Sequence, residues 1–459
     1  MTELLGQQPR GEAIQVFSVP HGTVPRLPQI AHGDGIYMWD TSGKRYIDVS
    51  SGPIANNIGH GNAHVLRAMQ EQAGKVAFAY PGQFESEANV RLADLVTDMA
   101  GPGLDRAFFV SGGSEANESA VKLCRQYMLA IGQPDRCKVI SRDPGYHGGT
   151  SGALALTGDR QMHDIFGALL PAHYKVPTPW TYRLPPNHTR DSYARHCAQA
   201  LEDKIVAEGP DTVMAFIMEP VGGVATGALV AEDIYMTMVR EICARHGVLL
   251  IYDEVMSGAG RTGHFLAADH WPDACPDMVV LAKGIAAGYT PMGAVLAPND
   301  MVRAVAGSGG FLNGFTYCSN PLSCAVGAAV LEEVRAHGLV ANAAARGPEL
   351  VERLWDIGAS NRVVGDVRGK GLLLAMELVT GPETKARIPV EMNAPAMVQR
   401  IAMDQGLAIY HRRTAYGENG DWLMIAPPLT VTSDQLDEIT DGLRETLRLF
   451  EAELRSEGI

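Results

Sequence analysis

The sequence predicts an α/β fold, in which a large domain with a central, mostly parallel sheet carries a smaller α+β lobe built from both chain ends. Between about residues 63 and 335, amphipathic segments with helical spacing alternate with short apolar runs, as in βαβ units. These runs are apolar throughout, which is typical of parallel strands covered by helices on both faces. A chain of 459 residues is too long for one compact core.

The elements can be assigned in order along the chain. A hairpin is predicted around Thr41-Ser42-Gly43, and helical spacing of apolar residues predicts helices over 64–76 and 85–100. A Gly-rich turn and a helix then occupy 111–131. Apolar runs predict strands at 106–111, 138–143, 212–220, 247–255 and 277–283.

The pattern changes after about residue 335. It predicts a hairpin at 363–379, a helix at 393–406, and a strand from 423 followed by a terminal helix that Thr432 and Gln435 would cap as a capping box. We therefore divide the chain into 1–62 and 336–459, which form the small lobe, and 63–335, the large domain. The Pro-rich segment 177–196 is expected to be a surface loop.

Charge and composition exclude several classes of partner. A net charge of -14 argues against nucleic acid and anionic membranes, and no apolar run reaches the length of a membrane span. The first residues lack the order of a signal peptide, and the seven cysteines form no CxxC pair, which favours the cytoplasm and no metal centre. His60 and His147 have no clustered partners at metal spacing.

Three predicted strands end on an ionisable residue: Glu219, Asp253 and Lys283. A single such residue usually marks only where a strand meets water. Parallel strands, however, share one carboxyl edge, where open α/β folds bind ligands, and burying an isolated charge is costly. Lys283 is also the only lysine between Lys204 and Lys370.

Two further segments complete a constellation. Ser114 follows two glycines at a predicted helix start, which is either an ordinary N-cap or an anion site. Tyr146 and His147 stand in a Gly-flanked turn after a strand, where the aromatic ring would face an open site. A phosphate cradle, an aromatic face, an aspartate and a lone lysine match the needs of pyridoxal phosphate, whose aldehyde binds a lysine and whose ring nitrogen needs a carboxylate.

The segments DEVMSGAGRTG (253–263) and GFTYCSNPLSCA (314–325) resemble the class III (omega) aminotransferases, which are fold type I pyridoxal-phosphate enzymes, and the resemblance extends over nearly the whole chain. It implies that Lys283 forms the internal aldimine and that Asp253 pairs with the pyridinium nitrogen. The other implied cofactor contacts are Gly113 and Ser114 at the phosphate, Tyr146 and Val255 at the ring faces, and His147 and Glu219 beside the ring. Thr316 would reach the cofactor of the partner in a homodimer, or in a tetramer built from it.

The departures from the family pattern point to the substrate. Gly149 and Val224 stand where relatives that use glutamate or ornithine carry an arginine and a glutamate, which favours the pyruvate-using transaminases of amines and omega-amino acids. The resemblance implies a ping-pong transfer from an amine donor to a keto acid. A decarboxylase or aminomutase of the same fold is the alternative. Among the substrate-binding candidates, Arg413 is favoured over Arg412 for the carboxylate, and the others are Ile54 and Tyr80.

Three other functions compete with this interpretation. GAGRTG (258–263) fits a dinucleotide fingerprint but is not followed by a long helical pattern, and GDVRGKG (365–371) has the wrong spacing for a phosphate-binding P-loop. A cofactor-binding protein without catalysis would be expected to lack Lys283 or Asp253, and both are present.

Overall fold

A seven-stranded sheet forms the centre of the large domain. The computed structural model describes residues 27–459, so the predictions for the first 26 residues, including the absence of a signal peptide, lie outside the described residues. All neighbouring strands are parallel except β10, which runs antiparallel to both of its neighbours. The predicted mostly parallel sheet is therefore confirmed. In spatial order the strands are β4 (Arg106–Val110), β10 (Gly293–Ala297), β9 (Met278–Ala282), β8 (Leu249–Asp253), β7 (Val213–Met218), β5 (Lys138–Asp143) and β6 (Tyr174–Pro177).

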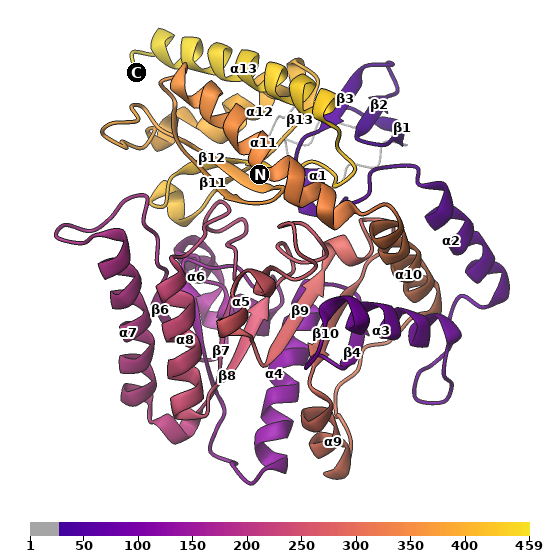
Figure 1. Cartoon of the computed structure of the whole chain (residues 1–459). Coiled ribbons are helices and arrows are strands. Elements are labelled where there is room, and N and C mark those ends of the chain that lie inside the picture. The colour runs from indigo at the N-terminus through magenta and orange to yellow at the C-terminus, as the bar shows by residue number, and fades with distance from the viewer. Residues whose placement is uncertain (1–26) are drawn as a thin grey trace, which may run out of the picture.

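Helices cover both faces of this sheet (Figure 1). Along β8, Leu250 and Tyr252 pack into one core cluster, and Ile251, between them, packs into another on the opposite face. This alternation explains why the strand is apolar at every position. The first cluster is shared with α3 (Glu87–Ala100), α7 (Arg190–Glu208), α8 (Asp233–His246) and α10 (Pro321–Ala336). The second is shared with α4 (Gly113–Ala130), α5 (Ser151–Leu156) and α9 (Asn299–Gly307).

A smaller lobe stands above the carboxyl edge of the central sheet (Figure 1). One of its sheets has the order β11-β12-β15-β14, and the other has the order β1-β2-β3-β13, in which β13 pairs in parallel with β3 and so joins the two chain ends. We therefore propose to keep the predicted divisions near residues 62 and 335. The strands are β1 (Ile30–Asp34), β2 (Tyr37–Asp40), β3 (Arg45–Asp48), β11 (Val364–Lys370), β12 (Leu373–Leu378), β13 (Leu407–Ala408), β14 (Tyr410–Arg413) and β15 (Asp421–Ile425).

Three long helices pack on this lobe, and short helices connect it to the large domain. The terminal helix begins after Thr432, whose side chain forms the predicted capping box with Gln435. The lobe helices are α11 (Leu339–Ala359), α12 (Ala394–Asp404) and α13 (Ser433–Ser456); the remaining helices of the described chain are α1 (Ser51–Ile54), α2 (Ala63–Lys75) and α6 (Arg160–Phe166), besides 3-10 turns.

The segment 177–196 is not the surface loop that the sequence predicted. Thr189 caps α7 in a capping box with Ser192, so the last seven residues of the segment are helical. The preceding loop is partly buried, because the Trp180 ring packs edge-on against Trp422 with the ring centroids 5.7 Å apart.

Arg261 joins the two parts of the molecule. Its side chain is fully buried, and burial lowers its pKa to about 9. Nη2 donates to Asn57 Oδ1 at 2.6 Å and to Ser51 Oγ at 3.3 Å, both from the N-terminal segment. Nη1 donates to the carbonyls of Leu372 and Pro427, from the C-terminal segment. One guanidinium thus connects the central domain to both halves of the small lobe.

Replacing Arg261 with methionine is expected to destabilise the protein by about 3 kcal/mol or more, because buried oxygens from both chain ends lose their donor. The measurement is the free energy of unfolding in urea. Arg448→Met is the matched control: this exposed arginine pairs with Glu445 on the surface of α13, and its loss should change stability by less than about 0.5 kcal/mol. Equal stabilities of the two variants would show that Arg261 does not hold the lobes together.

Candidate active site

A cavity of about 590 Å³ opens at the carboxyl edge of the central sheet. Strands β7, β8 and β9 each deliver an ionisable residue to it, as the sequence predicted, and β14 of the small lobe contributes to its wall. The lining includes Gly113, Ser114, Asn117, Tyr146, His147, Gly148, Met162, Glu219, Val224, Asp253, Val255, Met256, Lys283, Thr290, Met292, Tyr410 and Arg412.

Lys283 directly follows β9 and adopts a left-handed backbone conformation, with φ of 47°. Such a conformation is strained for a lysine and persists where the surroundings fix it. The next residue must be a glycine, because a Cβ on Gly284 would come within 2.3 Å of Asn57 Nδ2. Desolvation lowers the pKa of the Lys283 ammonium to about 8. The negative charges of Asp253 and Glu219 raise this pKa, but by less than desolvation lowers it. The Lys283 amine is therefore available as a nucleophile near neutral pH.

Asp253 is buried at the end of β8 and is held by three donors. Asn117 Nδ2 donates to Oδ2 at 2.7 Å, His147 Nδ1 lies 2.8 Å from the same oxygen, and the Val255 backbone N–H donates to Oδ1 at 3.1 Å. Since a carboxylate only accepts, His147 Nδ1 must carry its hydrogen. These donors fix the orientation of the Asp253 carboxylate.

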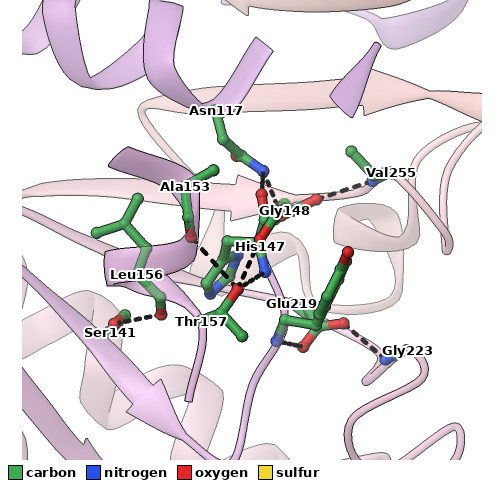
Figure 2. A network of polar contacts seen from close by, with 12 residues as sticks. Asn117, Ser141, His147, Gly148, Ala153, Leu156, Thr157, Glu219, Gly223 and Val255 are labelled. Atoms are coloured by element: carbon green, nitrogen blue, oxygen red, sulfur yellow. Dashed lines mark hydrogen bonds and ion pairs between the residues drawn. The ribbon is translucent and has the colours of Figure 1, made fainter. Parts of the chain in front are cut away.

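Asn117 was not predicted as a site residue. It lies in the first turns of α4, three positions after Ser114, and its amide nitrogen also donates to the His147 carbonyl at 2.7 Å. Figure 2 shows Asn117 above the His147 turn. Its two hydrogen bonds connect that turn to Asp253. The sequence could have indicated Asn117 through its position three residues after Ser114, because this spacing places the two side chains on one face of the helix.

Glu219 is the second buried acid of the cavity. Its carboxylate accepts the backbone N–H of Tyr146 at 3.1 Å and that of Gly223 at 2.8 Å (Figure 2). Burial raises the pKa of Glu219. The nearby positive charges of His147 and Arg142 lower this pKa, but by less than burial raises it. The acid therefore ties the Tyr146 turn to β7 and is less strongly ionised than an exposed glutamate.

The start of α4 forms a cradle for an anion. Its N-cap, Gly112, has no capping side chain, so the helix N-terminus is open to a ligand. Ser114 Oγ accepts the Gly149 N–H at 3.0 Å, and a Cβ on Gly148 would come within 2.4 Å of that hydroxyl oxygen. A Cβ on Gly113 would meet the Val255 methyl groups at 3.0 and 3.1 Å. The glycines thus allow the close approach that a phosphate requires.

The structure separates the two candidate arginines. Adjacent residues of a strand point to opposite sides, and on β14 it is Arg412 that faces the cavity. Arg413 points away: its Nε and Nη2 each donate to the buried Asp421 carboxylate at 2.6 Å, and Nη1 donates to the Val390 carbonyl. The preference for Arg413 as the carboxylate ligand is therefore not supported by the geometry.

The other predicted contacts lie outside the cavity lining of the described chain. Ile54 is buried in the core, with only 1% of its surface exposed, while its neighbours Pro53 and Ala55 line the cavity. Tyr80 is 52% exposed and does not line the cavity. Thr316 is exposed on a turn, where a residue that serves a partner's cofactor would have to lie. The sequence could not place these three, because their positions depend on how the loops fold.

The competing sequence motifs do not form nucleotide sites. Residues 258–263 are turns that lead into a short 3-10 helix, and 365–371 belong to the hairpin of β11 and β12. Among residues 27–459, no group of three His, Cys, Asp or Glu side chains is placed to hold a metal ion.

Comparison with known proteins decides the family. The model of the aminotransferase class-III family matches residues 18–447. The chain belongs to this family. As a class-III aminotransferase it is a pyridoxal-phosphate enzyme of fold type I, which confirms the predicted family, enzyme class, fold and cofactor. The cradle at α4, the buried Asp253 and the strained Lys283 fit this cofactor. The three relatives described next are named as transaminases or aminotransferases, and none of them as a decarboxylase or aminomutase.

Three relatives illustrate the range of this aminotransferase family. A diaminobutyrate–2-oxoglutarate transaminase from Halomonas elongata is 34% identical, with 95% of this chain and 93% of the relative aligned. A putrescine–pyruvate aminotransferase from Pseudomonas aeruginosa is 31% identical over 91% of this chain and 90% of the relative. The solved structure of an amine transaminase from an uncultivated Pseudomonas species, in its internal aldimine form, is 35% identical, with a TM-score of 0.87 over 95% of this chain and 99% of that chain.

Proposed function

We propose that this aminotransferase moves the amino group of a primary amine or omega-amino acid to a keto acid, with pyruvate as the acceptor, by a ping-pong mechanism. The observation that carries the proposal is the composition of the cavity wall. Methionines, valines and Tyr410 form an apolar surface suited to an amine donor, and among the described residues Arg412 is the one arginine of the lining. A single guanidinium suits an acceptor with one carboxylate.

Each residue of the site has one physical task in this proposal. The bound cofactor supplies an aldehyde that accepts the amino group and a ring that withdraws electrons. Lys283 would hold the cofactor through its amine, and when that amine is free it would move the proton of the substrate carbon. Asp253 holds a proton at the ring nitrogen. Tyr146 and Val255 confine the ring and keep water away from it, while the α4 N-terminus holds the phosphate through Gly113 and Ser114.

The choice of pyruvate over 2-oxoglutarate rests on two positions. Val224 lines the cavity, and Gly149 offers no side chain beside Ser114, so neither position provides a charge for a second carboxylate. The two relatives described above differ in the acceptor that their names give, so family membership leaves the acceptor open. A screen of acceptors with one amine donor therefore tests the proposal, and a preference for 2-oxoglutarate would contradict it.

Replacing Arg412 with alanine is expected to raise KM for pyruvate about tenfold or more, because the acceptor loses a charge-assisted contact, and to leave KM for an uncharged amine nearly unchanged. Arg413→Ala is the informative control. It breaks the Asp421 ion pair and should lower stability without raising KM for pyruvate selectively. If Arg413→Ala gave the selective KM effect and Arg412→Ala did not, the assignment of the carboxylate ligand would be reversed.

We further propose that two copies share their active sites in a homodimer, which could pair again into a tetramer. Thr316 lies outside its own chain's cavity lining and is exposed, and the exposed Phe78, Tyr80 and Tyr317 are large apolar side chains that a second copy would cover. We place the enzyme in the cytoplasm, in line with seven cysteines that form no disulfide. No described helix is long and apolar enough to span a membrane.

A further inference from the structure

Thr157, which follows α5 directly, is fully buried and has no role in the proposed function. Its hydroxyl oxygen accepts the backbone N–H of His147 at 2.9 Å. The same oxygen lies 3.3 Å from the carbonyls of Gly148 and Ala153, one of which takes its proton. Figure 2 shows the hydroxyl at the centre of these contacts, directly beside the His147 turn. The side chain therefore holds the main chain of a residue that contacts Asp253.

The His147 main chain is held from two sides. Thr157 binds its N–H, and Asn117 binds its carbonyl at 2.7 Å. With the backbone fixed, the imidazole can reach Asp253 Oδ2 in only a narrow range of orientations. The imidazole Nε2 is buried and has no hydrogen-bond partner within residues 27–459, so no second contact of the ring corrects its orientation. The position of the ring depends on its main chain.

Thr157 is itself held by a rigid support. The carbonyls at the C-terminal end of a helix lack partners within the helix. At the end of α5, Lys175 Nζ donates to the carbonyls of Ala155, at 2.9 Å, and Leu156, and to Ser141 Oγ at 2.8 Å. Ser141 Oγ in turn donates to the Leu156 carbonyl at 2.7 Å. Burial lowers the pKa of Lys175 to about 7, and the amine that these three acceptors surround fixes the residue that precedes Thr157.

We propose that Thr157 is a positioning residue of the cofactor site: its buried hydroxyl fixes the His147 main chain and thereby the imidazole that orients Asp253. The inference rests on the proposed role of Asp253 at the ring nitrogen. Without the hydroxyl, the buried His147 N–H has no acceptor and the turn must shift to find one. The shift would carry the imidazole away from Asp253, and the carboxylate would hold the ring proton less firmly.

The experiment compares Thr157→Val, which keeps the shape and removes the hydroxyl, with Thr157→Ser, which keeps the hydroxyl. In the valine variant the apoenzyme is expected to bind pyridoxal phosphate about tenfold more weakly. The pH midpoint of the visible absorption of the holoenzyme, which depends on the charge that Asp253 maintains at the ring, should rise by roughly half a unit. The serine variant should restore both quantities.

Thr440→Val serves as the matched control for loss of a buried threonine hydroxyl. This residue lies in α13 and only bonds back to the carbonyls of Leu436 and Asp437, so its loss should leave affinity and midpoint unchanged. Thr157→Val with a wild-type affinity and midpoint would overturn the inference, even if the variant were less stable. Asp253→Asn tests the proposed role of Asp253 separately from that of Thr157. If Asp253→Asn also left the pH midpoint unchanged, the proposed role of Asp253 at the ring nitrogen would be refuted, and not only the role of Thr157.

Discussion

Lys283→Ala is expected to abolish turnover and the visible absorption of the holoenzyme together. The residue stands at the end of β9, where its strained backbone and the close approach of Gly284 to Asn57 direct it toward the cavity. No other described lysine lines that cavity. Removing the amine therefore removes both the covalent attachment of the cofactor and the base that moves the substrate proton. The measurements are the absorption spectrum of the reconstituted variant and its steady-state rate.

A pH series on the apoenzyme tests the same residue. Burial lowers the pKa of Lys283 from the usual value for a lysine to about 8. The free amine should therefore predominate above pH 8. The rate of reconstitution with the cofactor is expected to rise with pH, with its midpoint near pH 8, because only the free amine attacks the aldehyde. Lys122→Ala, which removes an exposed lysine beside Asn313, should keep the spectrum and the pH profile. A coloured, active Lys283→Ala protein would refute the assignment.

The sequence predicted the three ionisable residues at the sheet edge of this site because of a simple geometric rule. Glu219, Asp253 and Lys283 each close an apolar run, and parallel strands bring their carboxyl ends to one edge, so finding the strands was enough to bring the residues together. β10 was not predicted as a strand. Its run GAVLA, from Gly293 to Ala297, is short and contains three Gly or Ala residues, so the strand signal is weak, and β10 is also the one antiparallel strand of the sheet.

The walls of the site could not be predicted in the same way. The sequence favoured Arg413 over Arg412, but the pairing of β14 with β15 determines which one faces the cavity, and it is Arg412. Thr157 lies ten positions after His147 and meets it again because α5 folds back on the turn, which no local pattern indicates. Asn117 was within reach of prediction by its helical spacing from Ser114, yet its significance depends on Asp253, a contact between distant parts of the chain.

Asp253→Asn is expected to lower the rate of the half-reaction with an amine on the order of 10³-fold, and to lower the free energy of unfolding by about 1–3 kcal/mol. The amide keeps the volume of the carboxylate and removes its negative charge. It also presents an NH₂ group where Asn117, His147 or the Val255 N–H now donates, so the remaining contacts would be donor against donor. Single-turnover kinetics of the loaded enzyme, followed by absorbance, measures the effect.

Glu219→Gln provides the comparison within the same cavity. Burial raises the pKa of Glu219, so its surroundings disfavour the charge that glutamine would remove. A glutamine carbonyl can also still accept one of the two backbone N–H groups that hold the present carboxylate. We expect a loss of about tenfold in the same half-reaction. Equal losses in the two variants would mean that the charge at Asp253 has no special part in the reaction, because both substitutions replace a buried carboxylate of the same cavity with a neutral amide.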